Sequence, residues 1–231
     1  MPNEDQKLSI IKKYWQKTPE FFSEKYKANF FQLLSPVNLF LLARRKKALQ
    51  LAGNVKDKKI LDVGCGSGIF MIDFIKRGAY VIGIDYSQKM LDITKKELEN
   101  YKIHKNKYKL LKADATKLPF TDKSFDFVLA TGLTDYLTDK QGQQFLEEAS
   151  RVLKKNGTLI VSFPVDKSPF AFVRSGFGLH IRQKFFKLPP IINQFSIEKI
   201  RKFLNEANFE DQETHKILAT MWIIKAKHKK D

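Results

Sequence analysis

The sequence predicts an α/β fold in which a mostly parallel sheet carries helices on both faces. A glycine-rich turn follows a short apolar strand, and acidic residues recur at the ends of later predicted strands. Between them, strand and helix patterns alternate over about a hundred residues, which requires crossover connections and therefore parallel strands. Open parallel sheets bind ligands at the carboxyl ends of their strands. The acidic strand ends therefore also predict where a functional site lies.

The first strand and its turn form the segment Lys59 to Phe70. The strand KILDV is followed by Gly64, Gly66 and Gly68, and then by an apolar helix that reaches Arg77. Glycines let the backbone bend tightly and approach a ligand where a side chain would clash. The N-terminus of the next helix attracts an anionic group. Several nucleotide-binding folds use such a turn, so the turn alone does not identify the ligand.

The next segments repeat the strand and helix pattern. Residues Tyr80 to Asp85 (YVIGID) form a second predicted strand that ends in an acid. A helix from Gln88 to Asn100 follows, with Ser87 as its N-cap. A third strand near 108–111 leads to Asp114.

The remaining elements complete the predicted sheet. Ser124 to Gly132 is the fourth strand with its exit loop, followed by a helix near Gln141 to Leu153. We predict a break at Asn156-Gly157 before a fifth strand from Thr158 to Phe163. The segment Glu210 to Lys227 is expected to add an antiparallel pair of strands.

The sequence resembles the class I S-adenosylmethionine-dependent methyltransferases, specifically their type 11 small-molecule group. The resemblance rests on LDVGCGSG, the acid in VIGIDYS, KADATKLPF and SFDFVLATGLTDYL, which together cover Lys59 to about Phe163. It implies a Rossmann-like, seven-stranded, mostly parallel sheet with an antiparallel last strand. It also implies S-adenosyl-L-methionine as the cofactor and S-adenosyl-L-homocysteine as the product.

The resemblance assigns a role to each matched position. Asp85 would accept both ribose hydroxyls and Asp114 the adenine amino group, while the glycine turn and the loop after the fourth strand enclose the methionine part. Asp62 either holds backbone amides of the turn or contacts the amino group of the cofactor. Met90 packs on adenine or only within its helix, and Cys65 is a small filler of the turn. The predicted cofactor-binding residues are Asp62, Gly64, Cys65, Gly66, Gly68, Asp85, Tyr86, Met90, Asp114, Ala115, Ala130, Thr131, Gly132 and Tyr14.

Catalysis by such an enzyme needs little acid or base chemistry. A sulfonium methyl is already electrophilic, so the protein mainly holds a nucleophilic O, N or C in line with it and excludes water. The candidates for a general base in O-methylation are His180 and Tyr136, although an ordinary surface histidine is the plainer interpretation of His180. One cysteine and four scattered histidines argue against a metal site.

Three alternative functions are weighed against a small-molecule methyltransferase. A nicotinamide-binding domain requires G-x-G-x-x-G, whereas this turn has its glycines at alternate positions 64, 66 and 68. An RNA methyltransferase would use the basic flanks, but residues 130–133 (ATGL) lack the N/D-P-P-Y-type tetrad expected of exocyclic-amine nucleic-acid methyltransferases. A cofactor-binding scaffold without turnover stays open, because glycines and acids report binding and not chemistry.

We predict a single methyltransferase domain, residues 1–231, in four parts. These are an N-terminal helical cover (1–58), the cofactor-binding core (59–165), a lid insertion (166–195), and a C-terminal helix with strands (196–231). The net charge is +17, yet only +4 of it falls in the core, so the excess lies on the flanks. The flanks combine basic and aromatic residues, which suits an acidic aromatic substrate, a membrane surface or nucleic acid. A solvated lysine-rich face is the plainer interpretation.

The start of the chain and its hydropathy predict a location. The segment MPNEDQKLSI is charged and lacks the apolar stretch of a secretory signal. No run reaches the roughly 18 apolar residues of a membrane span. A single cysteine suits a reducing compartment. We therefore expect a cytoplasmic protein, with peripheral membrane contact through the flanks as an open alternative, a small-molecule substrate as its partner, and an oligomeric state that the sequence does not define.

Overall fold

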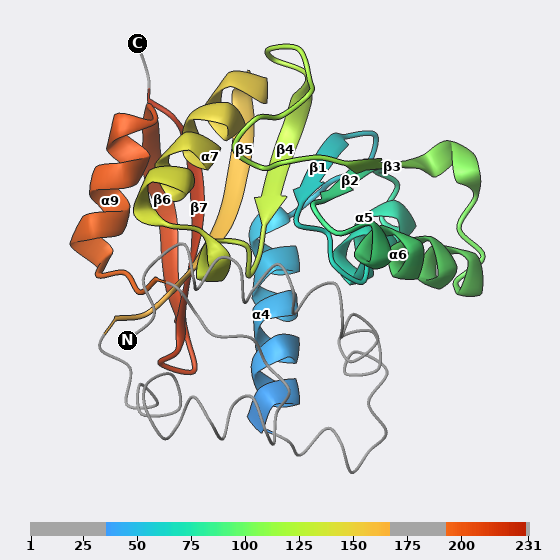
Figure 1. Cartoon of the computed structure of the whole chain (residues 1–231), viewed down its shortest axis with the longest axis horizontal. Helices are drawn as coiled ribbons and strands as arrows, with labels where there is room; N and C mark the ends of the chain where they lie inside the picture. The colour runs from blue at the N-terminus through green and yellow to red at the C-terminus, as the bar shows by residue number, and fades with distance from the viewer. Residues whose placement is uncertain (1–35, 167–192, 230–231) are drawn as a thin grey trace.

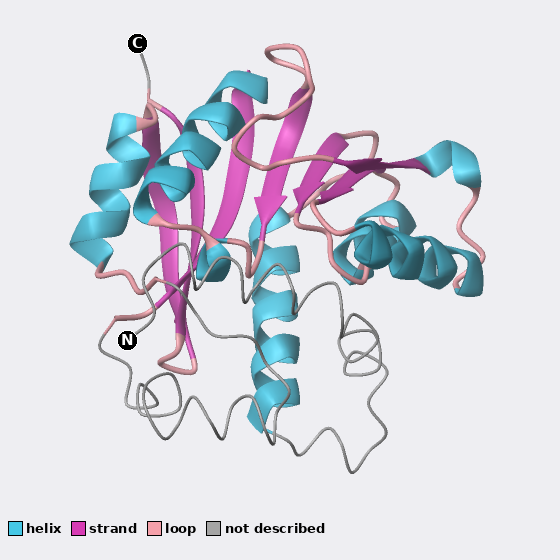
Figure 2. Ribbon diagram, viewed as in Figure 1, coloured by secondary structure: helices cyan, strands magenta, loops and turns pink. Residues whose placement is uncertain are grey.

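The computed structural model describes residues 36–166 and 193–229 (Figures 1 and 2). Its strands are β1 (Lys59–Val63), β2 (Tyr80–Asp85), β3 (Tyr108–Lys112), β4 (Phe125–Ala130), β5 (Leu153–Pro164), β6 (Phe209–Ile217) and β7 (Met221–His228). They form one seven-stranded sheet in the order β3-β2-β1-β4-β5-β7-β6. β7 runs antiparallel to both of its neighbours, and the other pairings are parallel. The predicted fold class is confirmed.

Helices cover both faces of this sheet, as Figure 2 shows. They are α4 (Pro36–Ala52), α5 (Ile69–Lys76), α6 (Gln88–Asn100), α7 (Asp139–Val152) and α9 (Ile197–Glu206), with short 3-10 turns η1 (Lys105–Lys107) and η2 (Thr134–Tyr136). α7 and α9 pack on one face in a core that contains Phe145, Leu146 and Leu204. α4, α5 and α6 pack on the other face through residues such as Phe74 and Leu91. In Figure 1, α4 (blue) is drawn below the arrowhead that marks the carboxyl end of β4.

Local sequence explains where the elements begin and end. β1 and β2 are nearly continuous apolar runs because both faces of a central parallel strand are buried. The Ser87 side chain accepts the amide of Met90 and caps α6, as predicted. α7 begins at Asp139, two residues earlier than predicted, because Thr138 and Gln141 form a reciprocal capping box.

The predicted break at Asn156-Gly157 is wrong. These residues lie inside β5, which begins at Leu153 directly after α7. Phe125 of β4 pairs with Leu153 of β5, but Phe127 pairs with Thr158, so residues 154–157 of β5 form a bulge within the strand. A β-carbon on Gly157 would lie only 2.9 Å from the backbone oxygen of Lys154, so glycine suits this close approach and does not end the strand.

The two ends of the predicted lid insertion lie side by side beyond β5. The amide of Phe195 donates to the Pro164 carbonyl at 2.9 Å, and the amide of Asp166 donates to the Phe195 carbonyl at 3.2 Å. Tyr14 and His180 lie outside the described residues, as do 167–192 of the insertion. No helix within residues 36–166 and 193–229 is long and apolar enough to cross a membrane.

Candidate functional site

The carboxyl ends of β1, β2 and β4 meet where the strand order reverses. β1 pairs with β2 on one side and with β4 on the other, so their exit loops leave from the same edge. Crevices at such a reversal are where open α/β sheets bind ligands. Asp62, Asp85 and the loop after Ala130 all lie at this edge, which is the juxtaposition that the sequence predicts.

The glycine turn is tied to the end of β2. The amides of Gly64 and Cys65 both donate to the Ile84 carbonyl at 2.9 Å. Gly68 then adopts a left-handed φ of 76° as the N-cap of α5. A β-carbon there would approach Thr94 Cγ2 to 2.6 Å, so the turn needs glycine both for its backbone angle and for space.

Asp85 fastens the turn while keeping acceptor capacity. Its Oδ2 accepts the Gly66 amide at 3.1 Å, and its Oδ1 accepts the Ser87 amide at 2.9 Å. Burial raises its pKa, and these amide hydrogen bonds oppose the shift. Each carboxylate oxygen has two lone pairs, so both can accept a further donor such as a hydroxyl. Because Ser87 already caps α6, a capping role alone does not explain Asp85.

Asp62 is a buried carboxyl at the end of β1 with an unsatisfied oxygen. The side chain is only 2% exposed, and its Oδ2 has no hydrogen-bond partner among the described residues. Burial and the neighbouring charge of Asp85 raise its pKa to about 7, while the charge of Arg44 opposes the shift. Buried acceptors rarely stay unpaired, so this oxygen points to a ligand that donates to it.

Arg44 is a site residue that the sequence analysis missed. It is buried in α4, and its guanidinium lies against the loop after β4, where a β-carbon on Gly132 would be 2.7 Å from the terminal nitrogen Nη1. Gly132 has a φ of 78°, and its amide donates to Ser162 Oγ, which fixes the loop to β5. The charge of Arg44 acts on the buried carboxyl of Asp62, so the site combines a buried guanidinium with its acids.

The signal for Arg44 was present but ambiguous. Arg44 lies in the basic N-terminal flank, within the run Arg44-Arg45-Lys46-Lys47, and the sequence leaves open whether such a flank meets a substrate, a membrane, nucleic acid or only solvent. In the structure, Arg44 belongs to the buried stripe of α4 that includes Leu41, Ala48 and Leu51. That helical spacing of three and four residues could have separated Arg44 from its exposed neighbour Lys46.

Asp114 lies on an ordered, exposed loop after β3. Its Oδ1 accepts both the amide and the hydroxyl of Thr116 at 2.8 Å, which forms a tight Asx turn. The turn uses only Oδ1, so the second carboxylate oxygen of Asp114, Oδ2, has capacity to accept a hydrogen bond from a ligand. The neighbouring Ala115 is half-buried. The loop can therefore present a carboxylate and a backbone amide together.

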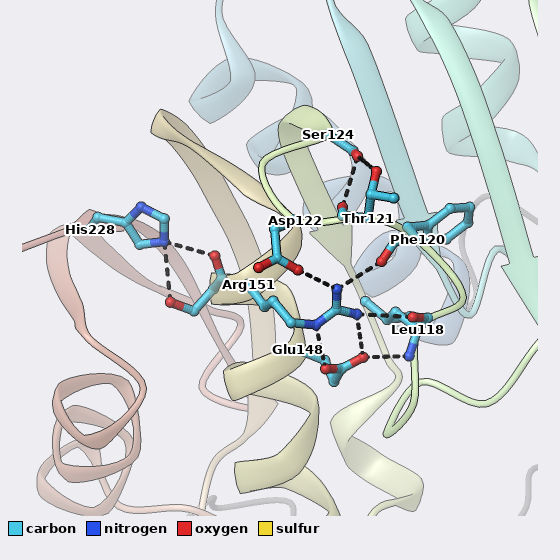
Figure 3. A network of polar contacts seen from close by, with 9 residues as sticks. Leu118, Phe120, Thr121, Asp122, Ser124, Glu148, Arg151 and His228 are labelled. Atoms are coloured by element: carbon cyan, nitrogen blue, oxygen red, sulfur yellow. Dashed lines mark hydrogen bonds and ion pairs between the residues drawn. The ribbon is translucent and has the colours of Figure 1, made fainter.

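The chain that follows Asp114 is held by Arg151 of α7 (Figure 3). Its guanidinium donates to the carbonyls of Leu118 and Phe120 and forms ion pairs with Glu148 and Asp122. Glu148 in turn accepts the Leu118 amide at 2.6 Å. The pair raises the pKa of Arg151 and lowers that of Glu148, so both stay charged. This clamp fixes the downstream end of the Asp114 loop.

The remaining predicted residues line the same edge or its support. Met90 is buried, and its methyl group would be 3.7 Å from a β-carbon on Gly66, so it lies beneath the glycine turn. Tyr86 is exposed directly after Asp85. Burial raises the pKa of the Cys65 thiol, which fits a filler more than a nucleophile. Tyr136 is half-buried in η2, just beyond the β4 loop. The described residues contain no cluster of three or more metal-ligating side chains.

The fold and this edge define a class of protein. A seven-stranded sheet of this order, a glycine turn after β1, and acids at the ends of β1 and β2 and after β3 agree with the class I methyltransferases that the sequence resembles. The family described as "Methyltransferase domain" matches residues 61–161.

Known proteins agree with that class. A demethylmenaquinone methyltransferase of Staphylococcus aureus (strain MRSA252) is 31% identical over 71% of this chain and 73% of its own length. A ubiquinone biosynthesis O-methyltransferase of Pelagibacter ubique is 29% identical over 63% of this chain and 65% of its own. The chain thus belongs to the S-adenosylmethionine-dependent methyltransferase family.

The share of each known protein that matches this chain differs from one protein to another. The chain spans 59 to 62% of the length of the demethylmenaquinone methyltransferases from Clavibacter sepedonicus and Tropheryma whipplei. The magnesium protoporphyrin IX methyltransferase of Synechocystis PCC 6803, solved with bound SAM, has a TM-score of 0.74 at 18% identity, and the match covers 99% of both chains. That likeness shows the shared fold.

Proposed function

We propose that this chain binds S-adenosyl-L-methionine at the β1, β2 and β4 edge and transfers its methyl group to a small-molecule acceptor. The observation that carries the proposal is the buried Asp62 oxygen without a partner, close to Asp85 and Arg44. An amino-acid tail has an ammonium and a carboxylate, which match an unsatisfied buried carboxylate and a buried guanidinium. A simple nucleotide offers no such pair of charges.

The residues present fit each part of that cofactor. Asp62 would accept a hydrogen bond from the ammonium of the cofactor, and Arg44 would donate to its carboxylate. Asp85 would accept hydrogen bonds from the ribose hydroxyls. Asp114 and the Ala115 backbone would hold the adenine. When bound, the cofactor supplies an electrophilic methyl on a sulfonium. The protein would then orient the acceptor in line and exclude water.

For the acceptor, we favour an oxygen of an amphiphilic or acidic aromatic metabolite. The basic and aromatic composition of segment 167–190, whose flanking residues meet at the end of β5, supports a lid over such a substrate. The similarity to a ubiquinone biosynthesis O-methyltransferase supports the same chemistry. Tyr136 and His180 are the candidates for a base that removes the acceptor proton. A cytoplasmic location with peripheral contact to a membrane fits a substrate of this kind.

Calorimetry with S-adenosyl-L-homocysteine tests the binding half of the proposal. The wild type should bind it, and Asp85→Ala should weaken binding at least about 100-fold through loss of the hydroxyl contacts and of the turn anchor. Asp92→Asn is the matched control, because Asp92 is an exposed acid on α6 that contacts only Gln88 in the hydrogen bonds described. No heat with the wild type, or equal binding by Asp85→Ala, would refute the proposal.

Radiolabelled methyl transfer tests the chemistry. Label should appear in a lipid-soluble small-molecule extract and not in RNA. Label in RNA that falls steeply with salt would instead favour the nucleic-acid alternative. Cofactor binding without label in any fraction would favour a scaffold.

A further inference from the structure

A partly buried ion pair outside the binding edge joins the first two described helices. Arg45 of α4 donates from Nε and Nη2 to the two oxygens of Asp73 on α5, both at 2.6 Å. The two side chains are 26% and 15% exposed. Such a two-pronged contact fixes direction as well as distance, which a single lysine bond does not.

The pair stands next to Arg44 in the sequence. Adjacent residues of a helix point about 100° apart, so Arg45 can face α5 while Arg44 faces the loop at Gly132. The apolar stripe of α4 sets its general rotation, but apolar contacts are not directional. The fork to Asp73 therefore restricts the small rotations and shifts that would move the Arg44 guanidinium.

The other end of the pair is also close to the site. α5 begins at its N-cap Gly68, the last glycine of the turn, and Asp73 lies just over one helical turn further on. A second contact, from Arg77 to the Leu49 carbonyl at 2.9 Å, joins the same two helices further along. α4 is thus fastened to the helix that continues the glycine turn.

We propose that Arg45 and Asp73 are positioning residues that hold Arg44 in register with the glycine turn, so that the site selects ligands with a carboxylate tail. This inference rests on the proposed function, because it assigns to Arg44 the carboxylate of the cofactor. It adds that affinity for that carboxylate depends on a contact that does not touch the ligand.

The test compares two ligands that differ by one group. S-adenosyl-L-methionine has the carboxylate, and decarboxylated S-adenosylmethionine keeps the ammonium and the sulfonium methyl but lacks the carboxylate. Arg45→Gln and Asp73→Asn should each weaken binding of the first by about 10-fold and of the second by less than about 2-fold. Asp73→Glu, which keeps a carboxylate for Arg45, should recover part of the loss. Arg201→Gln, which breaks the Arg201–Asp211 pair between α9 and β6, is the matched control and should change neither affinity.

A double-mutant cycle with Arg44→Gln separates positioning from general stability. If Arg45 acts through Arg44, the Arg45→Gln change should cause no further loss in the Arg44→Gln background. Equal losses for both ligands, or losses that add, would overturn the positioning role. A wild type that binds neither ligand would refute the proposed function itself. A wild-type preference for the carboxylate ligand that the Arg45 and Asp73 variants retain would refute this inference alone.

Discussion

Replacing Asp62 by Asn should make the unliganded protein more stable at alkaline pH while impairing cofactor binding. Burial and the charge of Asp85 raise the pKa of the Asp62 carboxyl from 3.8 to about 7, against the opposing charge of Arg44. Between these pH values the folded chain holds a proton that the unfolded chain has released. Stability therefore falls as pH rises through this window and is fully reduced above about pH 7.

The size of the effect follows from the shift. Each pKa unit corresponds to about 1.4 kcal/mol, so ionising Asp62 in the fold lowers the free energy of unfolding by about 4 kcal/mol. An Asn side chain has nearly the same shape and does not titrate. Its stability relative to wild type should thus rise by about 4 kcal/mol between pH 4 and pH 8, or roughly 10 °C in Tm for a chain of this size.

Thermal unfolding of both proteins by circular dichroism, measured from pH 4 to pH 8 without ligand, checks this expectation. Asp92→Asn, on the surface of α6, should give a curve parallel to wild type. The same linkage predicts that S-adenosyl-L-homocysteine binds the wild type more weakly below pH 7, because the ammonium needs the ionised carboxylate. If the wild-type and Asp62→Asn curves ran parallel across the whole range, the argument that the ionised Asp62 carboxylate destabilises the fold and favours a cationic ligand would be wrong.

Three further expectations concern the loops around the site. Gly68→Ala should lower the free energy of unfolding by about 2 to 4 kcal/mol in denaturant titrations. The added β-carbon would clash with Thr94, and the backbone at this position has a left-handed φ that alanine adopts only with strain. Gly53→Ala, with a φ of 63° and nothing within 4 Å, should lower it by only about 1 kcal/mol, and equal losses would count against the clash. Arg151→Lys keeps a positive charge but loses the several donors of the guanidinium, so amides of residues 118–124 should exchange with solvent at least about 10-fold faster. Unchanged exchange would show that Arg151 does not hold this segment. Asp114→Asn should retain the exposed Asx turn and change the free energy of unfolding by less than about 0.5 kcal/mol. It should nevertheless weaken binding of S-adenosyl-L-homocysteine by about 10-fold in calorimetry if the carboxylate accepts a hydrogen bond from the adenine amino group.

The sheet could be predicted because its central strands have no alternative environment. β1 and β2 are short apolar runs bounded by glycines or acids, and strands buried on both faces require such runs. Their predicted bounds, Lys59–Val63 and Tyr80–Asp85, are those observed. The error at Asn156-Gly157 has a physical reason. A glycine typical of turns also permits a bulge, and only the register against β4 distinguishes the two.

The acidic half of the site could be predicted, and the cationic half could not. Asp62 and Asp85 lie at the carboxyl ends of predicted strands and Asp114 follows a third, so the topology brings them to one edge. Arg44 reaches that edge from a helix that precedes the whole core. Its position depends on the Arg45–Asp73 contact across 28 residues of sequence, which local patterns do not encode.

The arrangement as a whole favours binding over stability. Without a ligand, Asp62 has an unsatisfied buried oxygen and a raised pKa, while Asp85 is also destabilised in its charged form. Both conditions oppose folding, and apolar side chains at these positions would remove them. A neutral ligand would leave them in place. A ligand with one cationic and one anionic group on the same tail would donate to the Asp62 carboxylate and accept from the Arg44 guanidinium together, so the unfavourable burial of Asp62 becomes selectivity for that tail.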